Sequence, residues 1–235
     1  MRPSLLSTVV LGLLVAVFIS LALWQWESKA EKEILVAEFE MAPELPLADA
    51  LAGAVRFAKI TASGRFDPRS LLLDNRVFRG QAGVAVLTPF HLANGGVLLV
   101  DRGWLRMPPD RRQLPEPSSP AEMVTIQGTL NRPPAPGLRL GEQDPLLGGD
   151  WPKLITYLDP AIVARRLDTE LLPWIIQLDP ASPHGFEDRQ WPVATMPPEK
   201  HGAYAVQWMA LAGAAFAAWI ALARRHKRIH LEKGP

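Results

Sequence analysis

Three side chains near the carboxyl end of the chain, His201, Tyr204 and Trp208, have types and a spacing that suit ligand binding. Residues three and four positions apart share one face of a helix, so a helical segment would point all three the same way. A neutral imidazole can serve as an axial ligand to haem iron, and nearby aromatic rings suit a porphyrin plane. The alternative is an interfacial histidine that hydrogen-bonds a loop. Spacing alone leaves both interpretations open.

Two long apolar segments would position these side chains. No charged residue occurs from Leu5 to Trp26 or from Ala203 to Ala223, and about 20 apolar residues are enough for a helix to cross a bilayer. Trp24 and Trp26 end the first segment, and such rings settle at the membrane interface. An ionisable side chain at the end of a membrane helix is costly. His201 is therefore the leading candidate for a functional residue.

Basic residues predict the orientation of these helices. Arg2 precedes the first segment and a basic cluster, Arg224 to Arg228, follows the second. Because basic flanks stay in the cytoplasm, both termini should be cytoplasmic and the intervening residues periplasmic in a bacterium. We predict a cytoplasmic N-terminus at 1–4, transmembrane helices at 5–26 and 203–223, a periplasmic domain at 27–202 and a basic cytoplasmic tail at 224–235.

The first apolar segment has an alternative interpretation as a cleavable signal peptide, since Ser20-Leu21-Ala22 resembles a cleavage site. Its apolar stretch is longer than the roughly 7 to 15 residues of a signal sequence, which favours a retained helix.

Small residues also recur at spacings that allow two membrane helices to approach closely. They are Gly12, Ala16 and Ser20 in the first segment, and Ala210, Ala214, Ala218, Gly213, Ala217 and Ala221 in the second. Alanine and glycine are also common in membrane helices in general, so this spacing leaves both interpretations open.

The composition excludes several classes of function. The formal net charge is only +1, with the excess in the tail, which argues against nucleic-acid binding. Cysteine is absent, which removes thiolate metal sites, covalent c-type haem and thiol redox chemistry. Ser182-Pro183-His184 lacks the strand-turn-helix context of a hydrolase nucleophile, so a membrane-anchored hydrolase is disfavoured. We predict a protein that is not an enzyme.

The residues between the spans predict a mainly antiparallel β (β-rich α+β) domain. Alternating apolar residues start at Val55 and predict a first strand. Gly64 interrupts this pattern and is expected to form a bulge or turn. Asn94-Gly95-Gly96 predicts a hairpin. Further strands are expected at 70–76, 83–90, 97–102, 124–130, 153–158 and 174–178. Short helices are expected at 45–52 and 160–167, a helical lead-in at 27–40, and proline-rich loops at 108–120, 133–145 and 180–198. The middle loop, with Gly141 and Gly148-Gly149, is expected to be mobile.

Val100-Asp101-Arg102-Gly103-Trp104 is the most distinctive stretch of this domain. An arginine at a strand end, before a glycine that permits a bend, could present its guanidinium to a carboxylate or propionate. The structural alternative is that Arg102 bonds Asp101 or a loop carbonyl while Trp104 packs in the core.

The order of these features resembles the Surfeit locus protein 1 family of cytochrome c oxidase assembly factors, over essentially the whole chain. The resemblance begins with Trp24-Gln25 at the end of the first span and includes the Asp101-Arg102-Gly103-Trp104 stretch. His201, Tyr204-Ala205 and Trp208 match the second-helix signature of that family. Further matches are Gly64-Arg65-Phe66, Leu73-Asp74-Asn75-Arg76, Gly80, Gly83, Thr88-Pro89 and Val124-Thr125-Ile126-Gln127-Gly128.

This resemblance implies a bacterial inner-membrane protein that binds haem a and assists its insertion into the catalytic subunit of a haem-copper oxidase. It implies His201 as the axial ligand, a pocket that includes Trp24, Gln25, Tyr204 and Trp208, and contact with a partner or propionate at Arg102. The implied partners are the oxidase catalytic subunit, the haem a synthesis machinery and the lipid bilayer. Ala22 and Ser28 depart from the usual glycine and arginine of the family. An anchored periplasmic binding or sensory module without haem remains the alternative.

Overall fold

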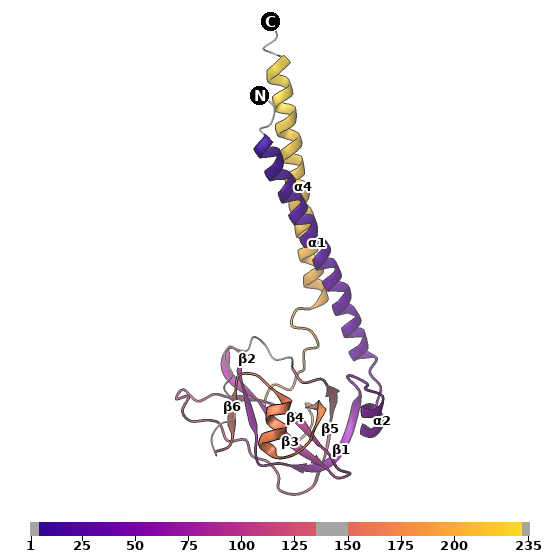
Figure 1. Cartoon of the computed structure of the whole chain (residues 1–235), viewed down its shortest axis with the longest axis vertical. Coiled ribbons are helices and arrows are strands. Elements are labelled where there is room, and N and C mark those ends of the chain that lie inside the picture. The colour runs from indigo at the N-terminus through magenta and orange to yellow at the C-terminus, as the bar shows by residue number, and fades with distance from the viewer. Residues whose placement is uncertain (1–4, 135–149, 232–235) are drawn as a thin grey trace. The chain divides into compact units, whose positions relative to one another are not determined.

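The computed structural model describes residues 5–134 and 150–231, which fall into two compact units (Figure 1). The helix unit contains α1 (Leu5–Glu40) and α4 (Pro198–Leu231). The β unit, residues 41–191, contains α2 (Leu47–Ala52), α3 (Pro160–Leu167) and the strands. The loop predicted around Gly141 and Gly148-Gly149 lies outside the described residues.

Helices α1 and α4 are each long and apolar enough to cross a membrane, and they lie side by side in Figure 1. The charged lead-in at 27–40 is the continuation of α1 and not a separate element. Many large apolar side chains on both helices are exposed to solvent in the isolated chain, where a bilayer would cover them. They include Leu6, Leu13, Val17, Leu23, Val206, Met209 and Phe216.

The β unit is built on one sheet, and the sheet closes into a barrel. Its strands are β1 (Lys59–Phe66), β2 (Leu71–Phe78), β3 (Gln81–Leu92), β4 (Val97–Arg106), β5 (Val124–Asn131), β6 (Lys153–Ile155) and β7 (Leu171–Leu178). They are ordered β1-β5-β7-β4-β3-β2-β6, and a further pairing of β1 with β3 closes the first five strands. Only the β2–β6 and β4–β7 pairs are parallel. The predicted mainly antiparallel β-rich fold is confirmed.

Alternating apolar side chains fill the barrel. In β1 every second residue is buried, so Ile60, Ala62 and Phe66 point into the core. A second apolar cluster lies under α3, where Val163 and Leu167 pack against the sheet. The predicted start of α3 is confirmed, because the Asp159 carboxylate accepts a hydrogen bond from the Ala161 N–H, ahead of the first turn.

Two details of the first strand differ from the sequence prediction. The strand begins at Lys59 and not at Val55, because Ala54 and Phe57 have φ angles of 49° and 64° and interrupt the extended backbone. Gly64 forms no turn; it lies inside β1 and pairs with both β5 and β3. A Cβ at Gly64 would lie 2.2 Å from the carbonyl oxygen of His91. Glycine therefore serves the close approach of the strands that closes the barrel.

Candidate functional site

The side chains of His201 and Gln25 meet inside the helix unit. Imidazole Nδ1 lies 2.7 Å from the amide oxygen Oε1 of Gln25, and each residue is only 8% exposed. An amide oxygen can only accept a hydrogen bond, so Nδ1 carries the proton and donates it. No residue that the structure describes bonds Nε2. The lone pair of a neutral imidazole is therefore on Nε2.

Buried small residues and a pair of aromatic rings lie on the same two helices as this pair. Ala22, next to Gln25 on α1, is 3% exposed, and Ala205, one turn after His201 on α4, is 1% exposed. Their small side chains allow the two helices to approach closely. Below them the rings of Phe18 and Trp208 stack with centroids 5.7 Å apart and planes 25° apart.

The structure brings together only some of the predicted pocket residues. Gln25, His201 and Trp208 face the partner helix, whereas Trp24 is 56% exposed and Tyr204 is 44% exposed. Sequence reasoning missed Phe18. Its signal is the spacing of Phe18, Ala22 and Gln25, which are four and then three residues apart and so share one face of α1.

This arrangement has the chemistry of a histidine ligand. Histidines that bind metals usually donate their other ring N–H to an oxygen, which fixes the tautomer and the ring orientation. The amide oxygen of Gln25 is such an acceptor, and in a neutral imidazole this hydrogen bond places the lone pair of His201 on Nε2. The aromatic rings of Phe18 and Trp208 add apolar surface beside it. The residues present therefore fit the axial bonding of a haem.

Arg102 is buried in the β unit and its donors are bonded to protein groups. Nε donates to the carbonyl oxygen of His184 at 2.8 Å, while Nη1 and Nη2 donate to Ser119 Oγ and the Ser118 carbonyl oxygen. Burial lowers the pKa of the guanidinium to about 10. Its carbon also lies 4.6 and 4.7 Å from the ring centroids of Phe66 and Phe186. These are the contacts of the structural alternative, in which Arg102 bonds a loop carbonyl.

Gly103 lies inside β4, opposite a register shift between β3 and β4, so the strand continues past Arg102 to Arg106. Gly103 has a φ of 101°, and a Cβ there would lie 2.5 Å from the carbonyl oxygen of Glu187. Burial raises the pKa of Asp101 to about 7, although its carboxylate accepts a hydrogen bond from the Gly103 N–H. Trp104 is buried and its indole N–H donates to the Arg76 carbonyl. A side chain at position 103 would therefore clash with the backbone of the loop at Glu187.

A second polar cluster, absent from the sequence prediction, connects β1, β2 and β3. Asp67 follows β1 and is 6% exposed. Its carboxylate accepts two hydrogen bonds from the Arg69 guanidinium and lies 3.0 Å from Nε2 of His91. Burial by itself would raise the pKa of Asp67, but the hydrogen bonds from Arg69 and His91 lower it to about 2. The carboxylate is therefore ionised at neutral pH.

The chain combines two helices that are long and apolar enough to cross a membrane with a β unit whose sheet closes into a barrel, and a buried histidine lies between the two helices. The model of the SURF1 family matches residues 12–213. The chain belongs to the SURF1 family, which is linked to cytochrome oxidase assembly.

Individual relatives support this assignment. An uncharacterized SURF1-like protein of Mycobacterium bovis is 27% identical over 172 residues, and two uncharacterized SURF1-like proteins of Mycobacterium tuberculosis match to the same extent. Each match covers 70% of this chain and 59% of the relative. The chain therefore aligns with less than two thirds of the length of these relatives.

Proposed function

We propose that the protein is an assembly factor for a haem-copper cytochrome c oxidase, which binds haem a and assists its insertion into the catalytic subunit. Family membership supports the link to oxidase assembly. The observation that carries the haem proposal is the 2.7 Å hydrogen bond from His201 Nδ1 to Gln25, which in a neutral imidazole leaves the lone pair of Nε2 for a metal.

Each residue of the site has a separate role in this proposal. His201 supplies Nε2 as the axial donor, and Gln25 holds the imidazole in the required tautomer. Trp208 and Phe18 provide an apolar wall, while the more exposed Trp24 and Tyr204 border the site from the lipid or interface side. Haem a would bring the redox-active iron that the oxidase requires.

The location of the protein is part of the same proposal. Basic residues precede α1 and follow the apolar part of α4, so both termini lie in the cytoplasm and the β unit lies in the periplasm of a bacterium. His201, at the β-unit end of the apolar stretch, then lies at the periplasmic side of the inner membrane. The oxidase catalytic subunit and the haem a synthesis machinery are the proposed partners.

The proposal is tested in a strain from which the gene has been deleted. Wild-type protein should restore haem a in the purified oxidase, whereas His201→Ala, present at equal level in the membrane, should restore only a small fraction. Gln207→Ala, an exposed polar position on the same helix, is the matched control and should behave as wild type. Full restoration by His201→Ala would reject the proposed role of the histidine.

A further inference from the structure

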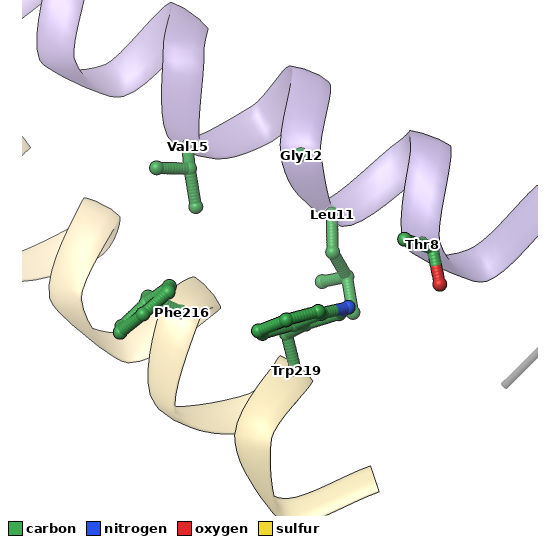
Figure 2. Close-up of a pocket in the computed structure, with 6 residues that line it drawn as sticks. All are labelled: Thr8, Leu11, Gly12, Val15, Phe216 and Trp219. Atoms are coloured by element: carbon green, nitrogen blue, oxygen red, sulfur yellow. The ribbon is translucent and has the colours of Figure 1, made fainter. Parts of the chain in front are cut away.

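The helix unit contains an apolar groove that is remote from His201. It has a volume of about 290 Å³ and is lined by Thr8, Leu11, Gly12 and Val15 of α1 and by Phe216 and Trp219 of α4 (Figure 2). Trp219 follows His201 by 18 residues, which corresponds to about 27 Å along a helix axis. The groove is therefore independent of the proposed haem site.

Its shape depends on a glycine and a pair of aromatic rings. A Cβ placed at Gly12 would meet no atom within 4 Å, so the absence of a side chain leaves open space on α1. Opposite it, Phe216 and Trp219 stack with centroids 5.9 Å apart and planes 25° apart, and Figure 2 shows both rings reaching from α4 toward α1. Ligand pockets usually occupy about 300–1,000 Å³, so this groove suits a chain more than a large ring system.

One polar atom of the groove has no partner. Indole Nε1 of Trp219 is buried and makes no hydrogen bond with any residue that the structure describes. In hydrocarbon an unpaired N–H cannot bond water, so leaving this donor without an acceptor costs free energy. A ligand with an apolar chain and a hydrogen-bond acceptor would fill the groove and, after a rotation of the indole, accept this N–H.

Positively charged residues near the groove indicate that the ligand has an anionic end. Arg224 follows Trp219 by five residues, about 7.5 Å along the helix, and its side chain is exposed. The sequence continues with Arg225, Lys227 and Arg228. Basic residues directly beyond a membrane helix attract anionic lipid headgroups. A single ligand molecule would therefore carry the apolar chain, the acceptor for the Trp219 N–H and a negatively charged end group.

We propose that this groove binds one anionic phospholipid of the leaflet that contacts the basic tail. An acyl chain lies along Gly12 between Val15 and Phe216. The ester carbonyl accepts the N–H of Trp219 after the indole turns toward the groove, and the phosphate pairs with Arg224. This site would anchor the ends of α1 and α4 to each other through the lipid.

Native mass spectrometry of the full chain in detergent tests the proposal, with phosphatidylglycerol or phosphatidylcholine of the same acyl chains added. Wild-type protein should retain one phosphatidylglycerol in preference to phosphatidylcholine. Gly12→Leu fills the groove and should weaken retention at least about tenfold, and Trp219→Phe, which keeps an aromatic ring but removes the donor, about fivefold. Arg224→Gln should reduce the preference for the anionic lipid.

Gly213→Leu is the matched control, because a Cβ at Gly213 also meets no atom within 4 Å but Gly213 does not line the groove. It should retain the lipid as wild type does. Equal retention of both lipids, or unchanged retention in Gly12→Leu, would overturn the proposal. A lipid-free dimer as the dominant species would also overturn it, since a second copy would then cover this face. Haem content should be unaffected by Gly12→Leu, which separates this test from that of His201.

Discussion

At the level of single residues, the hydrogen bond between His201 and Gln25 is the contact on which the candidate site depends. Gln25 and His201 are each only 8% exposed, and their side chains bond one another. A buried polar group left without its partner costs about 1–3 kcal/mol. The pair therefore both stabilises the helix packing and selects the imidazole tautomer.

We expect Gln25→Leu to lower haem affinity by about 10- to 100-fold, the usual effect of losing the group that orients a metal-bound histidine. Haem titration of the purified protein, followed by absorption, measures this change. Gln207→Leu makes the same substitution at an exposed position of α4 and should leave the affinity unchanged. Equal affinity of the Gln25 variant and wild type would remove Gln25 from the site.

The Arg102 side chain is only 2% exposed, so it belongs to the interior of the β unit and not to its surface. Arg102→Ala would leave the carbonyl oxygens of Ser118 and His184 without their donor. We expect it to lower the free energy of unfolding by about 3 kcal/mol or more. Arg111→Ala, which removes an exposed ion pair with Asp74, should cost at most about 1 kcal/mol.

Denaturant unfolding of the β unit, followed by near-ultraviolet circular dichroism of the full chain, compares the two arginine variants. If Arg102→Ala unfolds at the wild-type midpoint yet fails to support oxidase assembly, the functional interpretation of Arg102 would replace the structural one.

At the scale of elements, the Asp67 cluster holds the turn after β1 against β3. The folded-state pKa of about 2 is below the ordinary value of 3.8. Ionised Asp67 therefore stabilises the fold fully above about pH 4, and this contribution of about 2 kcal/mol is lost as the pH falls toward 2. Asp67→Asn should be less stable than wild type at pH 7, and the difference should shrink toward pH 2. A pH-independent difference in the unfolding free energy would contradict this assignment.

Local sequence patterns were sufficient to predict that most of the helices and strands occur. Alternating apolar residues marked segments that overlap all seven strands, and Asp159-Pro160 marked the start of α3. Barrel closure was not predictable, because the pairing of β1 with β3 depends on strand order and register and not on local pattern. For the same reason the contact between Asp67 and His91 was missed.

The candidate site shows the same contrast between features that local sequence predicts and contacts between residues far apart in the chain. Spacing placed His201 and Trp208 on one face, and resemblance indicated Gln25, but their contact joins residues 176 positions apart. Small residues were also ambiguous, since they occur on several faces of both helices. Gly12, Ala16 and Ser20 are exposed in the isolated chain, and Ala22, Ala205 and Ala212 are the buried ones.

At the scale of the whole molecule, the charge pattern predicts how the chain lies in the membrane. A reporter that is active only in the periplasm should be silent when fused after Pro235, next to the basic tail. The same reporter inserted near Gly148, in the segment between the two apolar helices, should be active. The opposite pattern of activity would reject both helices as spans with cytoplasmic termini.

The central claim is that Nε2 of His201 binds haem, and the absorption spectrum of the protein purified from cells that make haem a tests it most directly. Wild-type protein should carry haem a, and Tyr204→Phe, which keeps the ring, should retain most of it. His201→Ala should remain in the membrane but lose most of the haem, because the axial bond is absent. An unchanged haem content and spectrum in His201→Ala would contradict the account.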